Sequence, residues 1–212
     1  MPVPHTGGND LTRSIPLQAS DRVQSRYGDL LDAATKLFSE HGYERTTVRM
    51  IANEMGVQSG SLYSHIKSKE EVLRRIVIAC AESLMVRVED ARDRSETPEE
   101  RLRAMCRAHM RVQQEEKAAV TIYFDEWHKL DEESREYIVE LRRRYEQELA
   151  EVVEEGIERG DFGPVDVRGA VLVILSALNW AYTWYRPDGR LSPEEIADLF
   201  VDVIVEGLRR RD

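Results

Sequence analysis

Residues 58–65 carry side chains whose chemistry suits the recognition of nucleic acid. Short polar groups and hydrogen-bonding rings occur at Gln58, Ser59, Ser61, Tyr63 and His65. Groups of this kind form hydrogen bonds with base edges and with phosphates. The stretch has no carboxylate to repel a phosphate, and Gly60 lets the backbone approach one closely. The chemistry expected here is therefore binding, without a covalent step.

These side chains need a short helix that is held against a second one. The first of the two helices has its apolar residues at i, i+3, i+4 and i+7, namely Val48, Ile51, Ala52 and Met55. Thr46 or Thr47 can cap it. Gly56 supplies the left-handed position that ends it, and Leu62 anchors a second helix over about 59–65. The spacing is typical of a helix-turn-helix that binds DNA.

Two further features of this region bear on DNA binding. Lys67 and Lys69 stand at the start of the next helix, where side chains and backbone donors can meet a phosphate. An αα-hairpin that packs only for stability is the alternative for such a helix pair. The residues that we expect to contact DNA are Thr46, Thr47, Arg49, Gln58, Ser59, Gly60, Ser61, Tyr63, His65, Lys67 and Lys69.

The same region resembles a known family. From Arg26 to about Val77 the chain is similar to the TetR family of bacterial transcriptional repressors, and the similarity lies in AATKLFSEHGYERTTVRMIANEMGVQSGSLYSHIKSKEEVL. Gln58 departs from the Ser or Thr common at the cap of the reading helix, and Ile66 departs from the usual Phe. The resemblance implies an all-α repressor with an N-terminal three-helix DNA-binding domain, a C-terminal effector-binding and dimerisation domain, and about nine helices.

Charge is distributed unevenly along the chain. The net charge of −10 argues at first against DNA binding, because Lys and Arg supply most nonspecific affinity for phosphates. Residues 22–75, however, hold nine basic and seven acidic side chains, whereas residues 76–212 hold twenty and thirty-one. A mildly basic DNA-binding part therefore precedes an acidic body, whose charge lowers nonspecific binding or simply keeps exposed helices solvated.

Composition excludes several classes of protein. No run of eighteen apolar residues occurs, and the first ten residues lack the pattern of a signal peptide, so we expect a cytoplasmic protein without a membrane span. Cys80 and Cys106 have no partner at metal-ligand spacing, and we expect both to be small buried hydrophobic residues. The sequence indicates no cofactor and no metal site.

The chain divides into three parts by pattern. Residues 1–21 lack apolar periodicity and are expected to be a disordered arm, residues 22–68 the DNA-binding domain, and residues 69–212 the effector and dimerisation domain. Capping boxes start helices at Ser68, Thr97 and Ser192. Helices are also expected over 118–129, 132–159 and 167–185. The Arg142–Arg144 run lies among glutamates, which indicates solvated ion pairs.

The last two helices are the expected dimer interface. The helix over 167–185 is apolar on nearly every face, so it must be buried on more than one side. The family resemblance likewise implies homodimerisation through a four-helix interface, which would place two reading helices in successive major grooves of a palindromic operator. The residues assigned to this interface are Val173, Leu178, Tyr185, Ile196, Leu199, Phe200, Val203 and Ile204.

Aromatic residues in the C-terminal part point to a ligand pocket. Tyr123 and Trp127 form one i, i+4 pair, and Trp180 and Trp184 form another. We expect the effector to contact His109, Tyr123, Trp127, Trp180, Trp184 and Arg186. The alternative is that these aromatic residues belong to the core and the dimer interface.

The effector region has a resemblance of its own. AVTIYFDEWHKL and the run Trp180–Gly189 are similar to a TetR subgroup that controls fatty-acid or steroid catabolism and responds to acyl-CoA thioesters. Thr183 stands where relatives often carry an arginine, which leaves Arg186, with Arg190 in reserve, as the cation for a CoA phosphate. A different hydrophobic small molecule is the alternative effector.

Two alternative functions fit the sequence less well. A helical-bundle enzyme would need Glu-x-x-His on two helices, and only Asp125 to His128 comes close. An activator or a DNA-free scaffold would keep the fold. For the repressor, we expect the effector to move the helix over 69–94 and so to change the separation of the two DNA-binding domains.

Overall fold

The computed structural model describes the backbone of residues 19–208 and the side chains of residues 26–206. This part of the chain forms nine α-helices and one short 3-10 helix and has no strand. The helices are α1 (Ala19–His41), α2 (Val48–Glu54), α3 (Ser59–Leu62), α4 (Lys69–Asp93), α5 (Pro98–Glu115), α6 (Lys117–Glu126), α7 (Glu132–Arg159), α8 (Val167–Trp184) and α9 (Pro193–Leu208), with η1 (Trp127–Lys129) after α6. The expected all-α fold of about nine helices is confirmed.

Side-chain caps explain where several helices begin. The hydroxyl of Thr47 accepts a hydrogen bond from the backbone N–H of Met50 at the start of α2, and Ser68 does the same for Glu71 at the start of α4. Thr97 and Glu100 form a reciprocal capping box at α5. These bonds satisfy backbone donors that have no partner within the helix.

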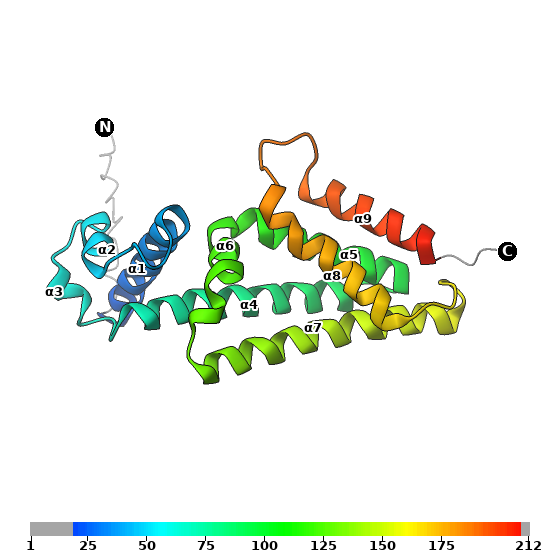
Figure 1. Cartoon of the computed structure of the whole chain (residues 1–212), viewed down its shortest axis with the longest axis horizontal. Helices are drawn as coiled ribbons and strands as arrows, with labels where there is room; N and C mark the ends of the chain where they lie inside the picture. The colour runs from blue at the N-terminus through cyan, green and yellow to red at the C-terminus, as the bar shows by residue number, and fades with distance from the viewer. Residues whose placement is uncertain (1–18, 209–212) are drawn as a thin grey trace, which may run out of the picture.

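The helices are arranged along one long axis (Figure 1). Helices α1, α2 and α3 form a compact unit at one end, and α4 runs from that unit lengthwise into the rest of the molecule. Helix α7 lies alongside α4, α6 stands between α1 and α8, and α9 packs on α5. The α4 helix therefore connects the predicted DNA-binding part to the predicted effector part.

The hydrophobic core has two large clusters that meet along α4. One joins α1, α2 and α3 to the first turns of α4, where Val72, Leu73, Ile76 and Val77 are buried, and also includes Ile122 from α6. The other joins the second half of α4 to α5, α7, α8 and α9. Because the first cluster crosses the expected boundary at residue 68, the N-terminal unit is packed firmly onto α6 and α4.

Three helix bounds differ from those expected. Helix α1 already begins at Ala19, inside the segment expected to be a disordered arm, and the rest of that segment, residues 1–18, lies outside the described residues. Helix α3 ends at Leu62, three residues before the expected end. In place of one helix over 118–129, the structure has α6 followed by the tighter 3-10 helix that begins at Trp127. The chain changes direction there before α7 begins.

Cys80 and Cys106 are both buried and free, and burial raises the pKa of each thiol to about 12. Within residues 19–208 no helix is long and apolar enough to cross a membrane. No three His, Cys, Asp or Glu side chains of that range gather as metal ligands.

Candidate functional site

The α2–α3 pair has the geometry of a helix-turn-helix. Gly56 follows α2 with a φ of +67°, a left-handed conformation that only glycine adopts freely. The N–H of Val57 donates to the carbonyl of Ala52 over 2.9 Å and closes the turn. Ala52 and Leu62 are both buried, so the two helices cross at a methyl group and are anchored by a leucine.

The outer face of α3 and of the turns on either side of it is polar and free of carboxylates. Exposed side chains expected to contact DNA are Thr47, Arg49, Gln58, Ser61, Tyr63 and Lys67, with Ser59 and His65 half-buried and Gly60 exposed. Tyr63 is 61% exposed, so both its apolar ring and its hydroxyl are open to a partner molecule. No Asp or Glu occurs between Met55 and Lys69. This surface can therefore approach DNA phosphates without repulsion from a carboxylate of the same segment.

Two of the residues expected to contact DNA form hydrogen bonds within the protein instead. Thr46 is fully buried, with its hydroxyl 2.9 Å from the carbonyl oxygen of Gly42 and 3.2 Å from that of Leu37, so its assignment as a DNA contact was wrong. The Lys69 ammonium donates to the carbonyls of Tyr43 and Thr46 over 2.9 and 3.0 Å and lies 4.1 Å from the centroid of the Tyr43 ring. Both residues hold the loop that precedes α2.

A cavity of about 360 Å³ lies among α4, α5, α6, α7 and α8. Its apolar wall includes Leu84 and Met85 of α4, and its aromatic wall includes Phe124. Of the six residues expected to contact the effector, His109, Tyr123 and Trp127 line it. The volume lies within the range of about 300–1,000 Å³ typical of small-molecule pockets.

Arg142 provides the cation of this cavity. Its Nε donates to the Tyr123 hydroxyl over 2.7 Å, and its guanidinium carbon lies 4.1 Å from the centroid of the Trp127 ring. Among residues 26–206 no carboxylate pairs with Arg142, whereas Arg143 pairs with Glu140 and Arg144 with Glu89. The interpretation of the whole arginine run as solvated ion pairs was therefore wrong at its first member.

The sequence did contain a signal for Arg142. Ile138, Arg142, Tyr145 and Leu149 follow one another at helical spacing on the inward stripe of α7, and the three other members of that stripe are buried. An arginine on a buried stripe is held by aromatic rings or by hydrogen bonds. The nearby glutamates obscured this signal, because they suggested ion pairs at the surface.

His109, Gln113 and Tyr145 form a buried polar group in the cavity wall. Tyr145 Oη lies 3.2 Å from His109 Nδ1, and Gln113 Nε2 lies 3.1 Å from His109 Nε2. Gln113 Nε2 also donates to the carbonyl of Leu178 over 2.7 Å. Burial lowers the pKa of His109 from 6.5 to about 4, so the imidazole is neutral near pH 7.

The other three expected effector contacts lie outside this cavity. Trp180 is 65% exposed, and Trp184 is exposed with its ring edge toward Phe200, at a centroid distance of 6.2 Å. Arg186 is exposed beside the α8–α9 loop. Leu175 and Asn179 face the cavity, so Trp180 and Trp184 lie on the opposite side of α8. Trp184 and Arg186 line a separate hollow beside α9, so the structure does not bring these three residues together with His109, Tyr123 and Trp127.

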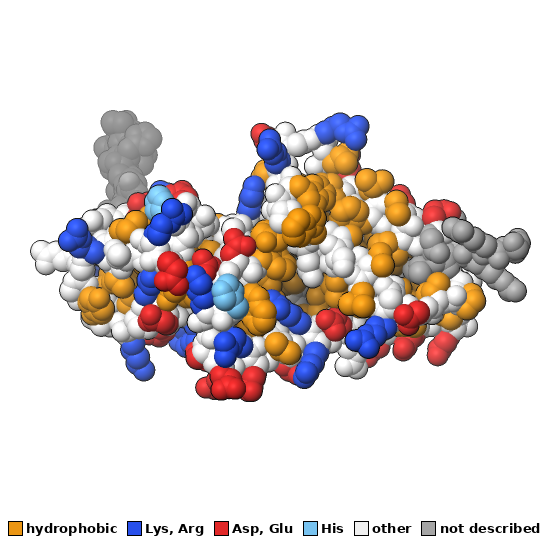
Figure 2. Space-filling model, viewed as in Figure 1, with side chains coloured by type: hydrophobic (Ala, Val, Ile, Leu, Met, Phe, Trp, Pro, Cys, Tyr) orange, Lys and Arg blue, Asp and Glu red, His pale blue; other side chains and the backbone are white. Residues whose placement is uncertain are grey.

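An apolar surface covers the outer faces of α8 and α9 (Figure 2). Its exposed members are Leu172, Val173, Trp180, Trp184, Leu199 and Val203. Of the expected interface residues, Val173, Leu199 and Val203 belong to it. Leu178, Tyr185 and Ile196 are buried within the protomer, so their assignment to the dimer interface was wrong. Phe200 and Ile204 are only partly buried against the core, and their assignment stays a prediction.

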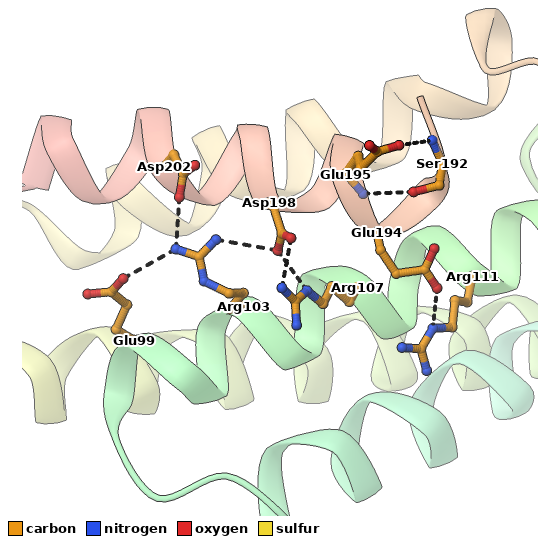
Figure 3. Close-up of polar contacts among 9 residues, drawn as sticks. All are labelled: Glu99, Arg103, Arg107, Arg111, Ser192, Glu194, Glu195, Asp198 and Asp202. Carbon is orange, nitrogen blue, oxygen red and sulfur yellow. Dashed lines mark hydrogen bonds and ion pairs between the residues drawn. The ribbon is translucent and has the colours of Figure 1, made fainter. Parts of the chain in front are cut away.

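Ion pairs between α5 and α9 hold α9 so that its apolar residues Leu199 and Val203 face outward (Figure 3). The Arg107 guanidinium makes two hydrogen bonds of 2.7 Å with the carboxylate of Asp198, and Arg103 joins Asp198 to Asp202. Arg111 pairs with Glu194 one turn further along. Because the acidic side of α9 faces α5, Leu199 and Val203 are left on the outside.

Two family models match the chain. Residues 30–76 match the family model of bacterial regulatory proteins of the tetR family, and residues 95–208 match the model of tetracyclin repressor-like C-terminal domains. The chain belongs to the TetR family: it is a helix-turn-helix transcriptional repressor and not an enzyme.

Solved structures of relatives include the following three. The transcriptional repressor KstR2 of Mycobacterium tuberculosis is 32% identical over 91% of this chain and 98% of its own, and its structure, described as that of a ketosteroid transcriptional regulator, superimposes with a TM-score of 0.81 over 88% and 96% of the two chains. PfmR of Thermus thermophilus is 37% identical, with a TM-score of 0.79 over 85% and 99%. AibR, solved in complex with isovaleryl coenzyme A and operator DNA, is 31% identical, with a TM-score of 0.75 over 84% and 97%.

Proposed function

We propose that this repressor binds a palindromic operator as a homodimer and releases it when an acyl-CoA thioester occupies the α4–α8 cavity. One observation carries the choice of ligand: the largely apolar and aromatic cavity contains a single arginine, Arg142, which donates to Tyr123 and pairs with no carboxylate in the described part of the chain, although Glu146 also lines the cavity. An acyl thioester matches this arrangement, because it joins an apolar chain to an anionic carrier. The complex of AibR with isovaleryl coenzyme A supports the same class of ligand.

The homodimer is supported by the exposed surface of α8 and α9. Trp180 and Val203 are 65% and 66% exposed in the protomer. Side chains of this size gathered on one face are typical of an interface between protein subunits. A two-fold dimer would present both α3 helices to one side of a DNA duplex, in major grooves about 34 Å apart.

DNA contact is assigned to the exposed polar face of α2 and α3. The residues that we propose for it are Thr47, Arg49, Gln58, Ser59, Gly60, Ser61, Tyr63, His65 and Lys67. Gln58 precedes α3 without a side-chain cap bond, so its amide is available to a base edge. Lys67 is exposed two residues before α4, and this position suits a contact between its ammonium and a phosphate.

The proposed ligand changes the position of α6 and α4. Trp127 and Tyr123 line the cavity at the end of α6, and the neighbouring Glu126 contacts the loop before α2. A ligand that inserts between Trp127 and Arg142 displaces this end of α6. The distance between the two DNA-binding domains of the dimer then changes, and their α3 helices no longer fit successive major grooves. The ligand favours this DNA-free arrangement only if it binds it more tightly than the DNA-bound arrangement.

Isothermal titration calorimetry with isovaleryl-CoA, longer straight-chain acyl-CoAs and free CoA tests the ligand assignment. We expect the thioesters to bind and free CoA to bind at least about tenfold more weakly, because free CoA leaves the apolar cavity unfilled. Arg142→Ala should weaken thioester binding by about tenfold. Arg143→Ala, which removes an exposed arginine one residue away, should leave it unchanged. Equal loss in both variants would contradict the role of Arg142.

A further inference from the structure

The cavity among α4–α8 has a closed end and an open end. Ala81 and Met85 of α4 line it and are 7% and 5% exposed. On the other side of the cavity, Glu146 of α7 is exposed, and Arg142 of α7 and Asn179 of α8 are partly exposed. The closed end is therefore apolar and lies at α4, whereas the open end is polar. A ligand whose anionic part lies at Arg142 directs its apolar part toward α4.

The residues at the closed end also belong to the packed core. Ala81 is part of the cluster that joins α4 to α1, α2 and α3, and Met85 is part of the cluster that joins α4 to α5, α7, α8 and α9. Their neighbour Cys80 packs with Val112 of α5 and Val120 of α6. Side chains in a protein core are close-packed, so little space can open behind them. The closed end therefore limits the depth of the cavity.

Hydrogen bonds limit the width of the same cavity. The Nδ1 atom of His109 on α5 lies 3.2 Å from the Tyr145 hydroxyl of α7, and Gln113 of α5 donates to the carbonyl of Leu178 on α8 over 2.7 Å. These side chains are buried, so a movement of α5 away from α7 or α8 would leave polar atoms without partners and without water. The cavity cannot widen at little cost to admit a larger ligand.

A cavity of fixed size limits the size of the acyl group. An apolar cavity of about 150 Å³ holds benzene, so a cavity of about 360 Å³ holds roughly fourteen carbon atoms. Part of this space, near Arg142, is taken by the thioester sulfur and oxygen and by the first carbons of the carrier. We infer that the effector is an acyl thioester of medium length, with about ten carbon atoms in its acyl group, and that Ala81 and Met85 set this length. The inference rests on the proposed function, since it concerns the ligand of the same cavity.

Ala81 and Met85 offer two changes of opposite sign. They stand one turn apart on α4, and both side chains line the cavity. Ala81→Leu places a larger side chain at the closed end and should remove space for about three carbon atoms. Met85→Ala should add space for about three. Val86→Ala is the matched control, because it shortens the side chain next to Met85, which is 65% exposed outside the cavity.

A series of ligands of increasing length tests the inference. Saturated straight-chain acyl-CoA thioesters from butanoyl to hexadecanoyl, below the concentrations at which they form micelles, are titrated calorimetrically into the full-length protein, together with the free fatty acids. Affinity should rise by about fourfold for each added methylene up to decanoyl-CoA and fall by at least about fivefold from there to hexadecanoyl-CoA. The optimum should move to octanoyl-CoA or shorter in Ala81→Leu and to dodecanoyl-CoA or longer in Met85→Ala. Val86→Ala should leave it in place.

The outcomes separate the length inference from the proposed function. Thioester affinity that still rises at hexadecanoyl-CoA, or that is highest at butanoyl-CoA, overturns the length limit and leaves the proposed function standing. An optimum that neither α4 variant moves overturns the role of Ala81 and Met85. If only free fatty acids bind, with an optimum that both variants move, the length inference holds and the thioester assignment fails. Binding by none of these ligands overturns both.

Thermal unfolding shows whether each variant is folded before it is titrated. If Met85→Ala does not fold, Leu84→Ala takes its place, because Leu84 lines the same wall of the cavity and is less buried. The series with the unchanged protein tests the length limit without any variant.

Discussion

The Glu126 carboxylate accepts a hydrogen bond from the backbone N–H of Tyr43 over 3.2 Å. Glu126 ends α6 next to Trp127 in the cavity wall, and Tyr43 lies in the loop before α2. Lys129 reinforces the contact, because its ammonium pairs with Glu126 and with Glu44 of the same loop. The wall of the cavity and the DNA-binding domain are thus joined by a polar contact that a ligand can displace.

Glu126→Ala should weaken the coupling between the two sites. The variant keeps the cavity, so ligand affinity should stay within about twofold, whereas the ligand-induced loss of operator affinity should shrink by about fivefold, or about 1 kcal/mol. Fluorescence anisotropy with labelled operator at several ligand concentrations measures both quantities. Asp125→Asn changes the preceding carboxylate, which contacts Tyr182 rather than the loop, and should behave as the wild type.

Substitution of Thr46 should lower the stability of the protein, whereas substitution of Lys67 should lower its affinity for DNA. Thr46→Val removes a buried hydroxyl and should lower the free energy of unfolding by about 1–3 kcal/mol, measured by urea denaturation.

Lys67→Ala should leave stability unchanged, weaken operator binding, and reduce the slope of log affinity against log salt by about one. Lys117→Ala, which removes an exposed lysine of α6, serves as its control. An unchanged salt slope in Lys67→Ala would argue against a phosphate contact.

A structural feature can be predicted from the sequence when the residues that determine it lie close together in the chain. The bounds of α7 follow from the cap at Asp131 and from Gly160, which adopts a φ of +80°, and both lie in the sequence itself. The helix-turn-helix follows from the spacing of Ala52, Gly56 and Leu62. Local signals of this kind act within one or two turns, so they predicted the bounds of α7 and the pairing of α2 with α3, although α3 ends three residues before the expected end.

The cavity was less predictable because it depends on which way an apolar helix faces. Helix α8 has large apolar residues on every side, so neither Trp180 nor Leu178 marks its inner face. The inner face is set by packing against α5 and α7, which the periodicity of α8 alone does not contain. The sequence therefore placed Trp180 in the pocket and Leu178 at the interface, whereas in the structure Trp180 is exposed and Leu178 is buried in the core.

Lowering the pH should destabilise the protein through His109. Its pKa is 6.5 when unfolded and about 4 when buried, so between these values the unfolded state binds more protons and stability falls as the pH falls. Above pH 6.5 the residue contributes no pH dependence, and below about pH 4 its contribution is constant. The total loss is about 3 kcal/mol. His109→Gln should flatten the urea-denaturation profile over this window, whereas His128→Gln, at a site outside the core, should not.

Val203→Glu should dissociate the dimer. A carboxylate at this exposed site of α9 leaves the protomer core unchanged but would be buried without a partner in a subunit interface. Sedimentation velocity should show a monomer that retains the helical circular dichroism of the wild type. Val86→Glu provides a matched control, since Val86 is 65% exposed on α4, and this variant should stay dimeric. Dimers in both variants would place the interface elsewhere.

The affinity of the repressor for its operator, measured with and without a bound acyl-CoA thioester, tests the central claim most directly. The operator is first selected from a pool of random duplexes, and ligand occupancy is established by calorimetry at the same concentrations. We expect saturation with the thioester that binds most tightly to weaken operator binding by at least about tenfold, and Arg142→Ala to require more ligand for the same effect. Unchanged operator affinity at demonstrated saturation would contradict the proposed release mechanism.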